Sequence, residues 1–350
     1  MSCPYVHHGV TAALLSILLG VSIGCTSSPK KPPETEYLFQ GPTMGTAYRV
    51  KVVGVGLSDA AKSEIDDAIT SQLDNVNAKM STYKVDSELS RFNRHETTEP
   101  FPFSEDVGAV LAEARRVSEA TSGAFDITVG PLVDAWGFGP SKPDSIPTES
   151  ELAQLRQSVG WENIELDQAA SAARKRYPAT QADLAAIAKG YAVDRVSKAL
   201  AALGYGNHMV EVGGEVRTTG QNAAGEPWRI AIERPAEGSA GPQRIVRLSD
   251  GAMATSGDYR NFIERDGVRY SHTIDPRTGR PVKHRLASAS VVHNSCMTAD
   301  AYATALMVMG EDEALRFATE HDLAVLLLVR DDDGGFTERA SPSFESSHRH

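Results

Sequence analysis

Residues 287–329 read ASASVVHNSCMTADAYATALMVMGEDEALRFATEHDLAVLLLV, and this stretch decides the fold class. Its hydrophobic pattern predicts a strand over Ala287–His293 and then a helix over Thr298–Met309. A second helix over Glu311–Glu320 and an apolar strand over Leu323–Val329 follow. Because strands and helices do not alternate one by one, as they do in a doubly wound parallel sheet, we predict an α+β protein.

The rest of the chain shows the same mixture of elements. Strand patterns fall on Ala47–Val55, Met209–Thr218, Trp228–Glu233 and Ile245–Leu248, and helical spacing falls on Ser58–Met80, Val107–Thr121, Glu149–Val159 and Leu184–Leu203. No internal repeat and no obvious linker interrupts the chain between Tyr37 and Val329. We therefore predict one domain over residues 37–330, followed by a polar, disordered C-terminal tail over residues 331–350.

The composition excludes one broad class of function. Of the 350 residues 41% are hydrophobic and 23% are charged, as in a globular protein, and the net charge is −11. A nucleic-acid-binding surface must be basic to displace counterions, so we expect no nucleic-acid partner. The GxxxxGK[ST] phosphate loop, the GxSxG nucleophile turn and the HExxH zinc motif are also absent from the sequence.

The N-terminus predicts export. Val10–Gly24 is an uncharged apolar run that is short for a membrane-spanning helix and suits a signal peptide over residues 1–24. Cys25 follows at once and resembles a bacterial lipidation site, although Ser22 departs from the usual pattern. An ordinary signal peptide or a hydrophobic N-terminal helix is the alternative. Residues 25–36 then form a lipidated cysteine and a Pro-rich tether, and we expect a membrane-anchored lipoprotein that faces the periplasm.

Short polar segments marked by glycine carry the candidate chemistry. In Gly41–Thr46 (GPTMGT), Met44 could pack on a flat ring, or the segment could be a strand-entry turn. Ser81-Thr82-Tyr83, which precedes Ser87–Asn93, could contact a ligand, or Ser87–Asn93 could be a capped helix start.

Three further segments suit an anionic or flat ligand. Asp126 is the lone carboxylate in an apolar stretch, and a buried carboxylate must be hydrogen-bonded or bound. Lys189, near a helix N-terminus, favours a phosphate, although an Ala-rich helix with a solvated lysine explains it as well. The Gly213-Gly214 pair permits a bulge or a backbone close to a ring.

The last two segments suggest acid–base and metal chemistry. His272 lies in Ser271–Pro281, a loop dense in hydrogen-bonding groups, and it is our candidate for a general base or a phosphate contact. A structural role for this histidine is the alternative. Asp300 and Thr304 lie at i and i+4 on one helix face, as hard-oxygen ligands of Mg²⁺ would. A first-turn Asp favoured by the helix dipole is the alternative for Asp300.

Taken in order, these segments resemble the ApbE-like FAD:protein FMN transferase family, once described as thiamine-biosynthesis lipoproteins. The resemblance extends from about Gly41 to Gly310 and rests on GPTMGT, MSTY, SELSRFN, GAFDITVGPLVDAWGFG, AIAKGYAVD, VEVGGE, SHTIDPRTGRP and TADAYATALMVMG. It implies a single domain of mixed, mainly antiparallel sheets with packed helices.

The resemblance also implies a ligand set. FAD would be held by Met44, Ser81, Thr82, Tyr83, Asp126, Lys189, Gly213, Gly214, His272 and Ile274. Mg²⁺ would be held by Asp300, Thr304 and a backbone carbonyl of the Ala185-Ala186 pair, for which we take Ala186. Relatives often have Gly in that stretch where this chain has Ala, so the sequence departs from the family pattern at the residue expected to supply this carbonyl.

The implied reaction cleaves FAD, attaches FMN to a Thr or Ser of an acceptor protein and releases AMP. The expected acceptors are flavin-carrying subunits of membrane redox pumps and related exported proteins. A Mg²⁺-dependent FAD pyrophosphatase that yields FMN and AMP is one alternative. A flavin-binding lipoprotein without catalysis is the alternative from another class.

Overall fold

The computed structural model describes residues 1, 2, 4, 34–139, 143, 145–235, 241–258, 262–265 and 268–347. It separates residues 1–33 from a compact unit over Glu34–His350. The expected signal peptide, apart from residues 1, 2 and 4, and the expected lipidation site Cys25 lie outside the described residues. Within those residues, no helix has the length and apolar character needed to cross a membrane.

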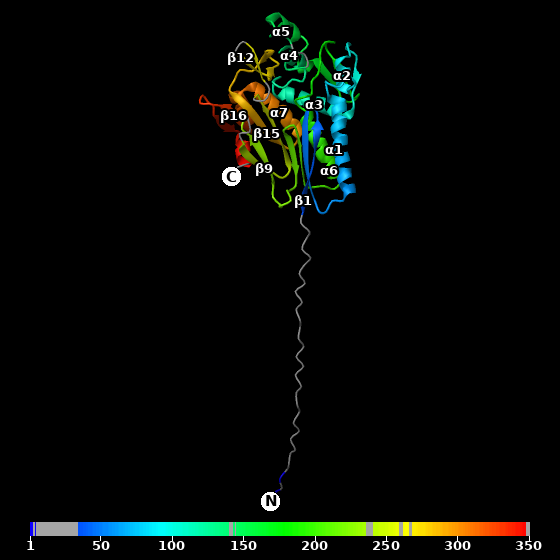
Figure 1. The fold of residues 1–350 in the computed structure, drawn as a ribbon, viewed down its shortest axis with the longest axis vertical. Coiled ribbons are helices and arrows are strands. Elements are labelled where there is room, and N and C mark those ends of the chain that lie inside the picture. Colours follow the sequence, from blue (N-terminus) through cyan, green and yellow to red (C-terminus); the bar gives the residue numbers. More distant parts are fainter. Residues whose placement is uncertain are drawn as a thin grey trace. The chain divides into compact units, whose positions relative to one another are not determined.

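An eight-stranded sheet forms the centre of the compact unit (Figure 1). Its strands, in spatial order, are β1 (Thr35–Thr43), β2 (Thr46–Gly54), β6 (His208–Val212), β7 (Glu215–Thr219), β10 (Gly251–Gly257), β15 (Leu286–His293), β16 (Ala324–Arg330) and β17 (Phe336–Ala340). Every neighbouring pair is antiparallel. The expectation of an α+β domain built on mainly antiparallel sheets is therefore confirmed.

Helices cover one face of this sheet. They are α1 (Asp59–Met80), α3 (Glu105–Ala120), α6 (Ala188–Ala202), α7 (Cys296–Met309) and α8 (Glu311–Glu320). The helices α6 and α7 pack against each other, α6 rests on β6 and β7, and α7 rests on β10 and β15. The largest core lies between the helices and the sheet, because the apolar faces of both must be shielded from water.

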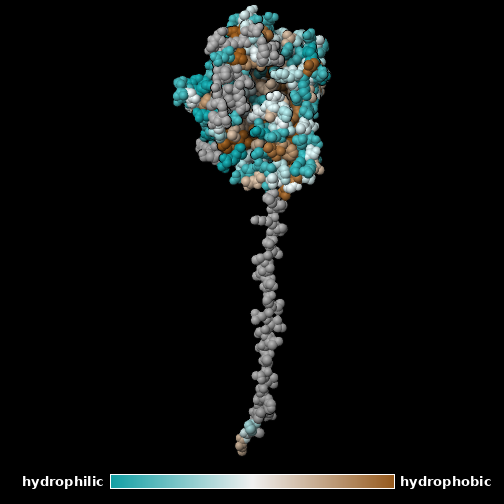
Figure 2. All heavy atoms as spheres, in the orientation of Figure 1, coloured by the Kyte–Doolittle hydropathy of each residue, from teal (hydrophilic) through white to brown (hydrophobic). Residues whose placement is uncertain are grey.

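The other face carries a hairpin and a short helix. The hairpin is β8 (Trp228–Glu233) with β9 (Pro242–Leu248), and the helix is α9 (Pro342–Ser347). Side chains alternate between the faces as a strand requires: Leu326 and Leu328 join the hairpin core, whereas Val325 and Leu327 join the helix core. Figure 2 shows that the visible surface of this unit is largely hydrophilic, with hydrophobic residues in separate groups.

Smaller elements complete the unit. They are α2 (Glu88–Asn93), β3 (Phe101–Pro102), α4 (Gly130–Ala135), α5 (Glu149–Leu155), a 3₁₀ turn (Trp161–Asn163), β4 (Ile164–Asp167), β5 (Ala172–Lys175), β11 (Phe262–Arg265), β12 (Val268–Ser271), β13 (Ile274–Asp275) and β14 (Arg280–Pro281). A small separate core joins α4, α5 and β13 through Leu132, Trp136, Leu152 and Ile274. The indole N–H of Trp136 donates to the carbonyl of Gly279 (2.8 Å), so this core anchors the β13–β14 hairpin.

Two strand predictions need correction. The segment Met209–Thr218 is not one strand but the two strands β6 and β7, joined at Gly213 and Gly214. Both glycines have positive φ (62° and 106°), which favours a tight hairpin over a continuous strand. The central strand β10 was not predicted, because its sequence GAMATSG consists mainly of small residues and lacks a clear apolar alternation.

The predicted disordered tail is also wrong over most of its length. Residues 336–340 form the edge strand β17, which pairs with β16, and Phe344 of α9 is completely buried in the hairpin core. The polar composition of this segment led to the prediction of disorder, but an edge strand and a short helix each need only one side that packs on the core. The helix predicted to start at Leu184 starts instead at Ala188, after a turn in which the Asp183 carboxylate accepts from the Ala185 N–H.

Candidate active site

A cavity of about 470 Å³ lies where α6 and α7 meet the end of β10 and the loops that precede α4 and β13. Eight residues predicted from the sequence line it, namely Asp126, Ala186, Lys189, Gly213, His272, Ile274, Asp300 and Thr304. These residues come from five segments spread over nearly 180 positions of the chain, and the fold brings them to one place.

Five other predicted ligands lie outside the wall of this cavity. Met44 sits in the β1–β2 turn with a φ of 47° and packs on the helix core, which is the strand-entry turn expected as the alternative. Ser81, Thr82 and Tyr83 connect α1 to α2, and the Tyr83 side chain is 79% exposed. Gly214 is the second residue of the β6–β7 turn. A role for these five in flavin binding stays a prediction.

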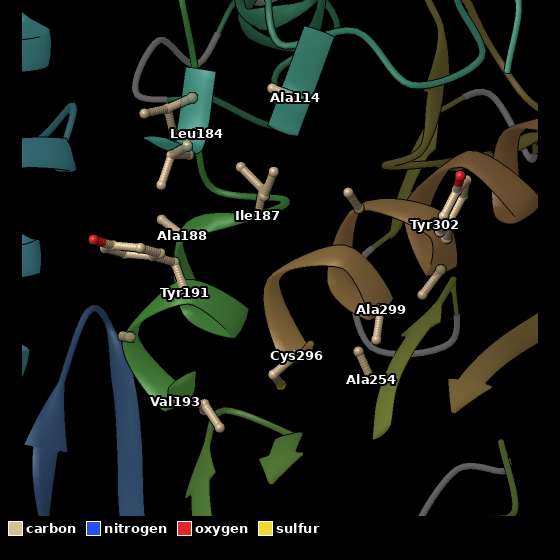
Figure 3. Close-up of a cluster of buried hydrophobic side chains, with 14 of the residues drawn as sticks. Ala114, Leu184, Ile187, Ala188, Tyr191, Val193, Ala254, Cys296, Ala299 and Tyr302 are labelled. Carbon is tan, nitrogen blue, oxygen red and sulfur yellow. The ribbon is translucent and has the colours of Figure 1, made fainter. Parts of the chain in front are cut away.

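The close crossing of α6 and α7 creates the charged part of the site. A Cβ atom at Gly190 would overlap the carbonyl oxygen of Cys296, so only glycine permits this approach. The backbone N–H of Gly190 donates to Asp300 Oδ2 (3.0 Å), and Lys189 Nζ lies 3.6 Å from Asp300 Oδ1. Figure 3 shows the two helices side by side, with Cys296 and Ala299 of α7 near the small Ala254 of β10.

Glu215 completes this group, although its role was not predicted from the sequence. Its Oε1 atom lies 3.1 Å from Lys189 Nζ, while its Oε2 atom is buried and has no hydrogen-bond partner among the described residues. The segment VEVGGE was noted only for its glycines. An acidic residue directly after a Gly-Gly turn and before the apolar Val216 was the available signal, since it occupies a strand position that this fold buries.

We call Lys189, Glu215 and Asp300 the charged cluster. It holds two carboxylates and one ammonium, and both carboxylates are nearly inaccessible to solvent. Burial raises the pKa of Glu215 and of Asp300, only partly offset by Lys189. Burial lowers the pKa of Lys189, but Asp300 and Glu215 outweigh it and hold that pKa above its ordinary value. With all three groups ionised, the cluster would carry two negative charges and one positive charge, and burial disfavours that state unless a proton or a cation adds positive charge.

Asp126, in another part of the wall, is hydrogen-bonded within the protein. Its Oδ1 accepts from the backbone N–H and the hydroxyl of Thr128 (2.7 and 2.6 Å), and its Oδ2 accepts from the Trp161 N–H (2.9 Å). Burial raises the pKa of Asp126 despite these bonds. This carboxylate organises the loop before α4 and the 3₁₀ turn.

His272 is half-buried and precedes the β13–β14 hairpin. Its ring makes an edge contact with Phe138, with ring centres 6.3 Å apart. The next residues are fixed, because Ile274 belongs to the small core and Thr273 N–H donates to Ser271 Oγ (3.2 Å). The hairpin thus presents His272 to the cavity from a rigid base.

Further lining residues also went unpredicted. Thr255, Ser256 and Gly257 end β10 at the cavity, and Thr255 Oγ1 is hydrogen-bonded to Ser290 Oγ (2.7 Å). Asp183 also faces the cavity, and burial raises its pKa. Small and hydroxyl side chains at a strand end leave room for a ligand and offer it hydrogen bonds.

A metal at this site would depend on few protein ligands. Within the ranges that the structure describes, no group of three or more His, Cys, Asp or Glu side chains is placed to hold a metal ion. Asp300 and Thr304 project from one face of α7 into the cavity. A cation that keeps waters and accepts oxygens from a ligand's phosphates suits such a sparse set.

A larger hollow of about 720 Å³ lies between α3 and the β4–β5 hairpin. Its wall contains alanines and the exposed Arg174–Glu165 pair, but none of the buried charged side chains. Size alone does not mark a catalytic site, whereas converging buried polar groups do, so the smaller cavity is the better candidate.

The fold and the cavity define a class: an α+β enzyme whose pocket combines buried charge with room for an extended anionic ligand. The chain belongs to the ApbE family, whose profile matches residues 44–327. It is 48% identical over 337 residues to a protein of Vibrio cholerae serotype O1 named FAD:protein FMN transferase, covering 95% of this chain and 97% of that one.

Solved structures agree with this assignment. The flavin transferase ApbE from Vibrio cholerae superimposes with a TM-score of 0.82 at 46% identity, over 90% of this chain and 100% of that chain. The apo flavinyl transferase ApbE from Pseudomonas stutzeri gives a TM-score of 0.84 at 36% identity, over 92% and 99%. The resemblance read from the sequence segments is confirmed, and so is the expected fold.

Proposed function

We propose that this chain is an FAD:protein FMN transferase that works in the cavity between α6 and α7. Relatives with that name match it over nearly their whole length. The charged cluster is the observation in the structure that carries the proposal, because two buried carboxyl groups that share one ammonium beside a cavity, with one oxygen unpartnered among the described residues, suit a bound cation.

We propose Mg²⁺ as that cation. The orphaned Glu215 Oε2 and the two carboxylates that share one lysine fit a hard divalent ion nearby. Asp300, Thr304 and the Ala186 carbonyl would hold it, since all three residues line the cavity. When bound, Mg²⁺ supplies charge neutralisation on the FAD pyrophosphate and so makes AMP a better leaving group.

The residues of the chain itself then bind and orient the reactants. Lys189 projects from the first turn of α6, where its ammonium and the helix N-terminus favour a phosphate. Small residues at Gly213, Ala185 and Gly257 let the extended ligand approach the backbone. Glu215 and Asp300 are buried, which strengthens their electrostatic contacts with Lys189.

His272 is our candidate for the general base. An imidazole nitrogen takes the proton of the acceptor hydroxyl while the hydroxyl oxygen bonds to the phosphorus of the FMN half. The bond from that phosphorus to the bridging oxygen breaks, and AMP leaves with the bond's electron pair. With water in place of the acceptor, the same step yields free FMN and AMP, so a pyrophosphatase side activity needs no additional group.

We also propose export and membrane anchoring. The apolar run Val10–Gly24 followed by Cys25 supports a signal peptide and a lipidated cysteine. Residues 26–34 would tether the enzyme, a tether two residues shorter than expected because β1 already begins at Thr35. An anchored enzyme suits exported acceptors such as flavin-carrying subunits of membrane redox pumps. Mass spectrometry of the mature N-terminus tests this, because Cys25→Ala should remove a lipid-sized mass and release the protein from membranes.

One experiment tests the central proposal. The full-length protein is incubated with FAD, Mg²⁺ and a candidate acceptor, and both acceptor mass and free AMP are followed. An FMN-sized gain with equal AMP release, lost in Asp300→Ala, is expected. AMP and free FMN without acceptor modification would favour the pyrophosphatase, and bound but intact FAD would favour a non-catalytic flavin binder.

A further inference from the structure

The three elements that carry the charged cluster meet a second time on the side away from the cavity. Lys189 lies on α6, Glu215 on β7 and Asp300 on α7. Five residues further along α6 is Asp194, and two residues further along β7 is Arg217. One turn before Asp300 is the N-terminus of α7, where Ser295 is the N-cap.

Asp194 is the centre of this second meeting point. Its Oδ2 accepts from the Ser295 hydroxyl (2.9 Å) and the Met297 N–H (3.1 Å), and its Oδ1 accepts from the Cys296 N–H (3.1 Å). A side chain from one helix therefore satisfies the free N–H groups at the start of another. A negative charge there also opposes the positive end of the helix dipole.

Arg217 links the third element. Its Nη1 donates to Asp194 Oδ1 (2.8 Å) and to the carbonyl of Asn294 (2.8 Å), the residue before the α7 N-cap. The Asp194 and Arg217 side chains are only 21% and 28% exposed, so solvent screens this pair less than a surface ion pair. We call Asp194, Arg217 and Ser295 the anchor.

The anchor bears on the charged cluster because a helix moves as a rigid body. Asp300 is one turn from Cys296, and its Oδ2 accepts from Gly190 on the helix that also carries Asp194. The contact between Gly190 and the Cys296 carbonyl leaves no spare room between the helices. A shift of the α7 N-terminus therefore displaces Asp300 relative to Lys189 and Glu215.

We propose that Asp194 is a positioning residue for the cation site of this enzyme. Through the anchor it holds the start of α7 so that Asp300 and Thr304 face the cavity at the correct distance from Lys189. Asp194 does not line the cavity, so its role would be indirect. The inference rests on the proposed function, because it concerns the Mg²⁺ that the charged cluster would bind.

The test compares Asp194→Asn with the matched variant Asp106→Asn, whose carboxylate lies on α3 and contacts α6 through Tyr191. Asp106, like Asp194, is a partly buried carboxylate with several partners: it accepts hydrogen bonds from Asn75, Lys79 and Tyr191. It joins α1, α3 and α6 and lies outside the cavity. Mg²⁺ binding to the full-length protein, with and without FAD, is measured by calorimetry with MgCl₂. The melting temperature and the rate of AMP release against Mg²⁺ concentration are measured as well.

The positioning role predicts a specific pattern. Asp194→Asn weakens Mg²⁺ binding by on the order of tenfold, and saturating Mg²⁺ restores most of the AMP release. Asp106→Asn lowers the melting temperature but leaves the Mg²⁺ affinity unchanged. Ser295→Ala removes the hydrogen bond to Asp194 and the cap on the Thr298 N–H, and it should weaken Mg²⁺ binding by less than Asp194→Asn does. If Asp194→Asn does not fold, the Mg²⁺ affinity of Ser295→Ala is the test.

Two results would overturn the inference, and they differ. If the wild-type protein binds no Mg²⁺, then the proposed metal site fails and takes the inference with it. If the wild-type protein binds Mg²⁺ and the folded Asp194→Asn binds it equally well, or Asp106→Asn weakens it as much, then only the positioning role fails.

Discussion

Two walls of the cavity use buried carboxylates in opposite ways. Asp126 accepts three hydrogen bonds from Thr128 and Trp161, all from uncharged donors close to its own loop. Asp300 shares the single ammonium of Lys189 with Glu215, and one Glu215 oxygen has no partner among the described residues. The first carboxylate is satisfied by the protein, whereas the second pair is not.

The difference separates a structural from a functional carboxylate. A buried acid whose hydrogen bonds are complete stabilises the backbone that surrounds it. A buried acid that lacks positive charge destabilises the fold until a ligand supplies that charge. Both kinds were singled out by the sequence as acids in small-residue or apolar surroundings, and only their partners distinguish them.

The largest expected effect comes from Asp300→Asn. We expect AMP release to fall by about 10²–10³-fold, because a charge that stabilises the reacting centre is lost. Without Mg²⁺ the melting temperature should stay equal or rise, since one of two competing negative charges is removed while the amide oxygen still accepts from Gly190. A clear loss of stability would contradict the view that Asp300, unlike Asp126, is not fully satisfied by the protein.

Asp126→Ala should show the reverse pattern. It leaves the Thr128 and Trp161 N–H groups unpaired, so the free energy of unfolding should fall by about 3 kcal/mol in urea denaturation. Glu162→Ala is the control: it removes an exposed acid beside the same turn and should change that free energy by less than about 0.5 kcal/mol. An Asp126→Ala protein that keeps its stability but loses FAD affinity would instead make Asp126 a direct ligand.

Gly190→Ala tests whether the charged cluster depends on the crossing of α6 and α7. The new methyl group would meet the Cys296 backbone, so we expect a loss of about 2 kcal/mol and weaker Mg²⁺ binding. Gly108→Ala on α3 is matched to it, because a Cβ there has open space and should stabilise the protein by about 0.5–1 kcal/mol. Equal effects of the two substitutions would show that the crossing does not set the cluster.

The smallest effect concerns pH and Asp106, a carboxylate with ample donors. Burial raises its pKa, but hydrogen bonds from Lys79, Tyr191 and Asn75 together outweigh burial and lower it to about 2, from an ordinary value of 3.8. A lowered pKa adds stability above pH 3.8 that is lost as the pH falls towards 2. The wild-type advantage over Asp106→Asn should shrink by about 1 kcal/mol over that interval, after allowance for partial solvent screening. Acid denaturation monitored by circular dichroism measures it, and no pH dependence of the difference would refute it.

Much of the fold could be predicted from local sequence. The predictions for α8 and β8 match the observed bounds, and those for α1 and α7 differ by one or two residues at the start. α1, α8 and β8 have a clear apolar period, whereas α7 is buried on nearly all sides and is marked by its apolar length and its end at Gly310. Prediction failed at β10, whose small residues give no period, and at β17 and α9, which bury one side each.

The candidate site was predicted less evenly. Asp300 and Thr304 could be paired from their spacing, because i and i+4 share a helix face in any setting. The Gly213-Gly214 pair was expected to permit a bulge or a close backbone, and it revealed neither the turn between β6 and β7 nor the Glu215 carboxylate beside Lys189. Asp194 showed no sign of its role, since its partners lie about 100 residues further along the chain.

The sequence by itself determined the α+β class, the order of the helices and strands along most of the chain, and the segments that carry polar chemistry. These depend on periods of two and 3.6 residues and on turn residues, which are local properties. Only the tertiary structure decided which of those polar groups lie together, as Glu215 and Asp300 do around the Lys189 ammonium. That outcome depends on how α6 crosses α7 above β7, and a crossing is set by the packing of residues remote in sequence, here by the absence of a side chain at Gly190.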